Sequence, residues 1–250
     1  MATASLQPLR EAPSGQSASE FNIAQRASLM STSPLFTGLT ASECKTIAWS
    51  ARPRIFMRDE LLFMQGHPVR NLVLLQTGCV KLTQLSPNGC EVILWMNGTG
   101  QTVGVPAEAP ACSHTCSARA MEQCQALTWE YKQLQSLLSD FPQIRKNIIQ
   151  IQTARLQELE ERFREVASER VAKRVALALI RLMKHIGKKA RGGIEVSLSR
   201  EELAQITGTT LFTVSRLLSK WAEEGLVLPL REAVVIRDAQ RLELVGDLAE

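Results

Sequence analysis

The segment from Thr210 to Lys220 carries side chains that can bind a polyanion and the edges of nucleobases. Arg216 has a guanidinium fork, which matches O6 and N7 of a guanine. Ser215 can hydrogen-bond to either kind of base, and the ring of Phe212 can lie against a thymine methyl group. These three side chains are predicted to read bases. Contacts to DNA phosphates are predicted for Arg200, Thr210, Ser219 and Lys220.

The spacing around these residues predicts two short helices joined by a glycine turn. Ser199 and Glu202 have the spacing of a capping box, and the helix that they begin is expected to break near Gly208. Thr210 can cap a second helix that runs to about Glu223. Its buried stripe is predicted at i, i+3, i+4 and i+7: Val214, Leu217, Leu218 and Trp221. Such a pair is typical of a helix-turn-helix, here followed by a predicted β-hairpin wing within residues 226–236.

Basic residues are concentrated before and within this motif. Between positions 168 and 220, eleven Lys and Arg residues stand against four acidic residues, a net charge of +7 within a chain whose total is +4. A field of this sign attracts nucleic acid, although a solvated basic face without a partner is the alternative. The stretch is predicted to contain an amphipathic helix that ends at Gly187 in a left-handed cap, and a basic loop over residues 188–193.

A heptad pattern precedes the basic region. Asp140 is predicted as an N-cap with Pro142 in the first turn, and apolar residues then recur at alternating spacings of three and four around the polar position Gln152. The apolar positions are Ile149, Leu156, Leu159, Phe163 and Val166. So narrow a seam on a charged helix predicts pairing with a second copy, and a helix lying on its own domain is the alternative.

The N-terminal half has the pattern of short strands. Gly66, Gly78, Gly89 and Gly100 recur every 11 or 12 residues, which is hairpin spacing for an antiparallel double sheet. The chain is therefore predicted to be α+β, with an antiparallel β-roll of the double-stranded β-helix or jelly-roll type. The predicted divisions are a disordered tail (1–32), the β-roll (33–139), a dimerisation helix (140–167) and a winged helix-turn-helix (168–250).

Other functional classes find little support in the composition. No apolar run reaches the roughly 18 residues of a membrane span, and no secretory signal is evident, so the six cysteines are expected to be reduced in the cytoplasm. Three scattered histidines and no nucleophile–base pair argue against an enzyme. One group has metal-ligand chemistry: Cys112, His114, Cys116 and Cys124. Three interpretations of that group are open: uninvolved or buried thiols, redox-reactive cysteines, and haem or metal ligands.

Taken together, these motifs resemble the CRP/FNR family of bacterial regulators. The resemblance rests on motifs that occur in the family's order: Leu35-Phe36, Gln65-Gly66, Gly78 to Leu82, Pro87-Asn88-Gly89, Gly100 to Gly104, and Thr213 to Arg216 within the recognition helix. It implies a homodimeric transcription regulator whose β-roll senses a signal. It also implies a palindromic double-stranded DNA site, and RNA polymerase as a partner if the protein is an activator.

Two departures from the family pattern bear on function. Members that bind cAMP hold the ribose with a Glu and the cyclic phosphate with an Arg-Ser pair, whereas this chain has Val105 and about His114-Thr115 there. We therefore expect the protein not to respond to cAMP. The β-roll would instead sense a redox signal, a gas through haem or metal, or another small molecule, or it would act without an effector. Cys112 and His114 are similar in spacing to the haem-ligating segment of the family's carbon monoxide sensor. Many relatives also have Glu at position 212, which would accept from cytosine, so Phe212 changes the expected target.

A second class of function remains open at this point. The β-roll could belong to an effector-binding module that regulates a protein partner without reading DNA. A gel shift with equal affinity for every sequence would favour that alternative.

Overall fold

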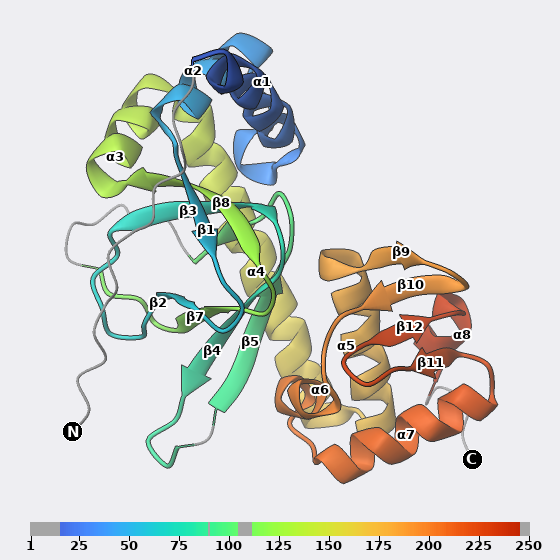
Figure 1. Ribbon diagram of the computed structural model, residues 1–250. Coiled ribbons are helices and arrows are strands. Elements are labelled where there is room, and N and C mark those ends of the chain that lie inside the picture. Colours follow the sequence, from blue (N-terminus) through green and yellow to red (C-terminus); the bar gives the residue numbers. More distant parts are fainter. Residues whose placement is uncertain (1–15, 90, 105–111, 246–250) are drawn as a thin grey trace.

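The computed structural model describes residues 16–89, 91–104 and 112–245, in which a β-rich part and a smaller helix-rich part are joined by a long helix. That helix, α4 (Pro142–Ser168), runs along the β-rich part and leads into the C-terminal part, as Figure 1 shows. This order agrees with the α+β fold predicted from the sequence. No helix among the described residues is long and apolar enough to span a membrane.

The β-rich part is a roll of two antiparallel four-stranded sheets, ordered β1-β8-β3-β6 and β2-β7-β4-β5. Side chains from both sheets share one apolar core, which contains Phe56, Leu75, Leu82 and Ala126. The strands are β1 (Arg52–Phe56), β2 (Leu61–Phe63), β3 (Asn71–Thr77), β4 (Val80–Leu85), β5 (Glu91–Asn97), β6 (Thr102–Val103), β7 (Ser117–Ala120) and β8 (Cys124–Glu130). The roll predicted from the glycine spacing is confirmed.

Glycine is required at the turn between β3 and β4. Gly78 has φ +94°, and a Cβ atom there would lie 2.5 Å from Sγ and 2.9 Å from Cα of Cys124. Gly89, at the β4–β5 turn, has φ +83° but no described atom within 4 Å of a built Cβ. Both turns need a residue that can adopt a positive φ. At position 78 the residue must also lack a Cβ atom, because Cys124 occupies the space where it would lie.

We expect Gly78→Ala to lower the free energy of unfolding by roughly 2–4 kcal/mol, because backbone strain adds to a clash with a buried strand. Gly89→Ala is the matched control, with backbone strain alone and a cost of about 1 kcal/mol. Urea denaturation of both variants measures the difference. Equal losses would show that the contact with Cys124 carries no weight.

Three helices close one end of the roll. They are α1 (Gln16–Thr32), α2 (Ala41–Ser50) and α3 (Tyr131–Asp140), with a 3₁₀ turn η1 (Pro34–Phe36) after α1. The prediction of a disordered tail over residues 1–32 is wrong for residues 16–32, and the rest of that range lies outside the described residues. Ile23, Ala27 and Met30 form a stripe of α1 that is buried against the core around Trp129. This stripe offsets the entropy of ordering the segment.

The start of α4 also differs from the expectation. Pro142 occupies the first turn as predicted, but Asp140 ends α3 and the N-cap position of α4 is Phe141, which makes no side-chain cap. The two helices follow each other almost without a break, because the N–H of Phe141 still bonds the carbonyl of Leu137.

The C-terminal part has a helix-turn-helix beside a small sheet. Its elements are α5 (Val171–Ile186), β9 (Lys188–Ala190), β10 (Gly193–Val196), α6 (Arg200–Thr207), α7 (Leu211–Glu223), β11 (Val227–Pro229), β12 (Val234–Ile236) and α8 (Ala239–Glu243). The antiparallel pairing of β11 with β12 confirms the predicted wing. Two details were wrong. Gly187 has φ −63° and not a left-handed cap. Residues 188–190 of the expected loop form a strand, because they pair with β10.

Candidate nucleic-acid interface

Helix α7 is fixed on one side by its apolar stripe. Val214, Leu218 and Trp221 are buried, and they join α5, α6 and the sheet in one core. Thr210 caps the helix as predicted, since its Oγ accepts the N–H of Thr213 at 3.2 Å. The direction in which the other face points is therefore set by packing.

That other face is open to solvent and carries the predicted reading residues. Phe212 is 77% exposed, although an aromatic ring of this size is usually covered. Arg216 is exposed, and it makes no hydrogen bond or ion pair with the described part of the chain. Five predicted residues and Glu223 line a single open hollow on this face: Phe212, Ser215, Arg216, Ser219, Lys220 and Glu223. Figure 1 shows α7 along the lower edge of the C-terminal part, with α5 and the small sheet above it.

Two predicted phosphate contacts lie outside that hollow. Arg200 is half-buried in the first turn of α6, and the hydroxyl of Thr210 is already engaged by Thr213. Glu223 was missed by the sequence reasoning, although its spacing of four from Ser219 places it on the same face. A carboxylate there repels phosphate, so it bounds the surface that a DNA backbone can approach.

Helix α6 holds α7 in place. Ser199 and Glu202 form the predicted capping box, in which Ser199 Oγ accepts the N–H of Glu202 at 3.1 Å and Glu202 Oε2 accepts the N–H of Ser199 at 2.9 Å. The helix ends at Gly208, whose φ of +62° gives the left-handed turn expected of glycine. The two helices pack directly against each other through the shared core.

Helix α4 presents an apolar stripe that nothing in the described chain covers. The five predicted heptad residues are all exposed: Ile149 (60%), Leu156 (57%), Leu159 (43%), Phe163 (76%) and Val166 (60%). Exposed apolar side chains at heptad spacing are typical of a helix that pairs with another copy.

The four predicted sensor residues do not form a metal site. Within the described residues no three His, Cys, Asp or Glu side chains are placed to hold a metal ion. Cys112 is exposed in a loop, whereas Cys124 opens β8 and is buried behind the Gly78 turn. Burial raises the pKa of Cys116 and of Cys124, so little of either thiol is in the reactive thiolate form at neutral pH. The structure therefore does not bring the four side chains together as one ligand set, and the three interpretations of this group stay predictions.

The described part of the roll also fits a cyclic nucleotide poorly. The ring of His114, at the position of the expected phosphate clamp, stacks on Phe63 with centroids 3.7 Å apart and planes 6° apart. Burial and the neighbouring His67 lower the pKa of His114, so it is uncharged at neutral pH. The guanidinium of Arg155, which reaches the roll from α4, donates to the carbonyls of Thr102 and Gly104. No cation is left facing a phosphate among these residues. Val105 lies outside the described residues.

Comparison with known proteins identifies both parts. A family described as "Crp-like helix-turn-helix domain" matches residues 173–245, and one described as "Cyclic nucleotide-binding domain" matches residues 53–141. The chain is 29% identical to the Cyclic AMP receptor protein of Thermus thermophilus over 217 residues, 87% of this chain and 98% of that protein. It is 26% identical to a CRP-like cAMP-activated global transcriptional regulator of Mycobacterium tuberculosis over 210 residues, 83% and 94% of the two chains.

The fold is also similar to that of a solved structure. FixK2 from Bradyrhizobium japonicum superposes with a TM-score of 0.70 over 80% of this chain and 99% of its own, at 22% identity.

Proposed function

The chain belongs to the CRP/FNR family of DNA-binding transcription regulators, and we propose that it acts as a homodimer that reads a palindromic DNA site through α7. The observation that carries this proposal is the solvent-exposed face of α7, where Phe212, Ser215 and Arg216 lie opposite a buried apolar stripe. We assign sensing to residues 33–139, dimerisation to 140–167 and DNA binding to 168–250, in the cytoplasm of a bacterium.

Each reading residue has a distinct role in the major groove. Arg216 donates two hydrogen bonds to one guanine, and Ser215 bonds a neighbouring base edge. Phe212 packs on a thymine methyl group, because its ring cannot accept from cytosine as a glutamate would. Lys220, Ser219, Arg200 and Thr210 bind phosphates and fix the helix in the groove without reading sequence. The Arg216 guanidinium has no hydrogen-bond or ion-pair partner among the described residues, which supports its role.

Pairing of two α4 helices through the exposed stripe places the two α7 helices in twofold symmetry. A twofold protein matches a DNA site with twofold symmetry, and its half-sites are about one helical turn apart. If the protein activates transcription, RNA polymerase is the further partner.

The β-roll is proposed to work without cAMP. The stacked, uncharged His114 and the engaged Arg155 support this, because a cyclic phosphate bound there would lack a charged partner. A redox signal, a gas or another small molecule would then regulate the protein, or the protein would bind DNA without any effector.

Selection from random duplex DNA tests the proposal. We expect the protein to enrich a palindrome with one guanine and at least one thymine fixed in each half-site, and cAMP to leave the enrichment unchanged. Replacing that thymine with uracil, which lacks the methyl group, should weaken binding about fourfold per half-site, because burying a group of this size contributes roughly 0.8 kcal/mol. Recovery of no motif at all would reject the proposed function.

A further inference from the structure

The β-roll touches the DNA-reading unit through one well-covered ion pair. Lys81 lies in β4, where it pairs with Met96 of β5 and Arg119 of β7, and its Nζ is 2.9 Å from Glu202 Oε1 of α6. The two side chains are 17% and 18% exposed. Two further ion pairs between the same parts, Arg58–Glu232 and Lys188–Glu122, are far more exposed and contribute little.

The Glu202 carboxylate serves two partners at once. One oxygen binds Lys81, and the other accepts from the backbone and hydroxyl of Ser199 in the capping box. Burial opposes ionisation of Glu202, but the backbone N–H of Ser199 and the ammonium of Lys81 lower its pKa below the usual value. The residue that begins the helix-turn-helix is thus the residue that the β-roll binds.

Apolar packing also joins the roll to the helix-turn-helix beside this ion pair. Cys79, Ile93 and Met96 of the roll belong to the same core cluster as Leu203 and Val214 of the helix-turn-helix. At the β5–β6 turn, a Cβ on Gly98 would lie 2.7 Å from the carbonyl oxygen of His185, so roll and α5 meet with no room for a side chain.

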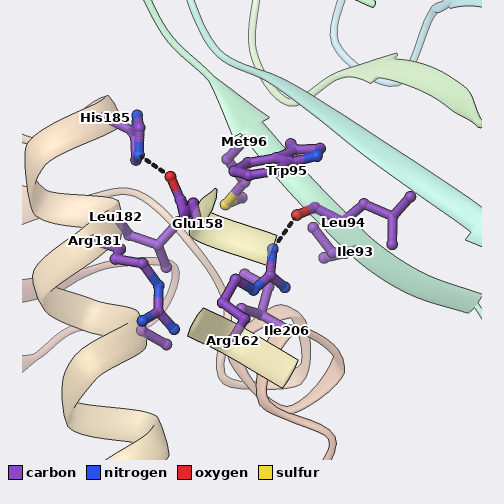
Figure 2. Close-up of a pocket in the computed structure, with 11 residues that line it drawn as sticks. Ile93, Leu94, Trp95, Met96, Glu158, Arg162, Arg181, Leu182, His185 and Ile206 are labelled. Carbon is purple, nitrogen blue, oxygen red and sulfur yellow. Dashed lines mark hydrogen bonds and ion pairs between the residues drawn. The ribbon is translucent and has the colours of Figure 1, made fainter. Parts of the chain in front are cut away.

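Polar contacts hold α5 along α4 beside this interface, as Figure 2 shows. His185 bonds Glu158 of α4 at 3.2 Å, and Arg162 of α4 donates to the carbonyl of Leu94 in β5. The guanidinium of Arg181 donates two hydrogen bonds to the carboxylate oxygens of the buried Glu165, at 2.6 and 2.9 Å. The His185–Glu158 and Arg181–Glu165 contacts join α5 to α4 across a link of two residues, 169–170, and so define one orientation of the C-terminal part relative to α4.

We propose that Lys81 is a positioning residue for DNA reading, which acts through Glu202 to fix the angle of α6 and α7 relative to α4. This inference rests on the proposed function, because the angle matters when two α7 helices must fit two half-sites. Helix α6 packs directly on α7, so a tilt of α6 carries the reading face with it. Lys81 is not among the residues that line the hollow on α7, so its proposed effect is on the orientation of the reading face and not through a DNA contact.

The test compares palindromes whose half-sites have the natural spacing with palindromes that have one base pair added or removed. One base pair moves a half-site by roughly 3.4 Å and rotates it by roughly 35°. Lys81→Met removes the charge at nearly constant length. We expect it to lower affinity for the natural spacing about tenfold, within the usual range of coupling between sites. The preference for the natural spacing over the altered spacings should fall by a similar factor. Without the ion pair, the two helix-turn-helix units can change their orientation and fit either spacing.

Three further variants separate positioning from folding. Lys81→Arg keeps the cation and should restore the spacing preference. Glu202→Gln keeps the capping box, since glutamine serves at that position, but loses the ion pair, so it should reproduce Lys81→Met. The double variant should add little to either change. Lys132→Met, an exposed lysine on α3 far from the C-terminal part, is the control and should behave as wild type.

Gel-shift titration at fixed salt, with thermal melting of each variant, gives the result. A Lys81→Met protein that keeps the wild-type spacing preference would overturn the inference, and so would a Lys81→Arg protein as defective as Lys81→Met. A wild-type protein that fails to prefer the palindrome over scrambled DNA would overturn the proposed function together with the inference. The two failures are therefore distinguishable.

Discussion

We expect Phe163→Glu to make the protein monomeric and to reduce its DNA affinity about 10²- to 10⁴-fold. Two linked DNA-binding domains gain that much affinity over a single one. Phe163 is 76% exposed in the single chain, and in the proposed dimer its ring meets the partner helix. Covering such a ring is worth about 1.5–3 kcal/mol per chain, and a carboxylate in its place must be desolvated as well.

Sedimentation analysis and gel-shift titration measure the two parts of this prediction. Gln157→Glu is the matched control, because it adds the same charge to an exposed position of α4 outside the apolar stripe. The control should remain dimeric and bind DNA as the wild type does. A Phe163→Glu protein that stays dimeric would place the interface on another surface, and the exposed stripe of α4 would then need a different explanation.

The sequence predicted those parts of the fold whose signals are local. Capping at Ser199 and Thr210 depends on residues three positions apart, and the roll was evident from glycines at turns that require positive φ. The buried stripe of α7 follows from helical periodicity alone. These features needed no knowledge of distant contacts.

The remaining features depend on contacts between segments far apart in the chain. Helix α1 was missed because its apolar residues are few among Ala and Ser, and its burial depends on α2 and the core around Trp129. Cys112 and Cys124 are near in sequence, but the chain turns between them, and they end in a loop and in a buried strand. Nothing in the local sequence of Lys81 indicates Glu202, which is 121 positions away.

The second large effect that we expect is the loss of guanine recognition in Arg216→Ala. The guanidinium is exposed on α7, makes no bond to the described chain, and shares its hollow with Phe212 and Ser215. A bidentate arginine–guanine contact contributes roughly 1–3 kcal/mol of discrimination, and a dimer makes two, so a full palindrome should bind about 30- to 10⁴-fold more weakly. Arg216→Lys should recover little of this, because an ammonium lacks the planar fork.

Lys220→Ala distinguishes base reading from phosphate binding on the same face of α7. Loss of a phosphate contact should weaken binding to every sequence alike and reduce the dependence on salt by about one ion per subunit. Arg216→Ala should instead leave binding to random DNA almost unchanged and remove the guanine from the selected motif. If selection with Arg216→Ala returned the wild-type motif, Arg216 would not be the guanine reader, and the specificity of α7 would have to come from Ser215 and Phe212. The comparison is decisive because both variants remove one cation from one helix, so a general electrostatic effect would change them equally.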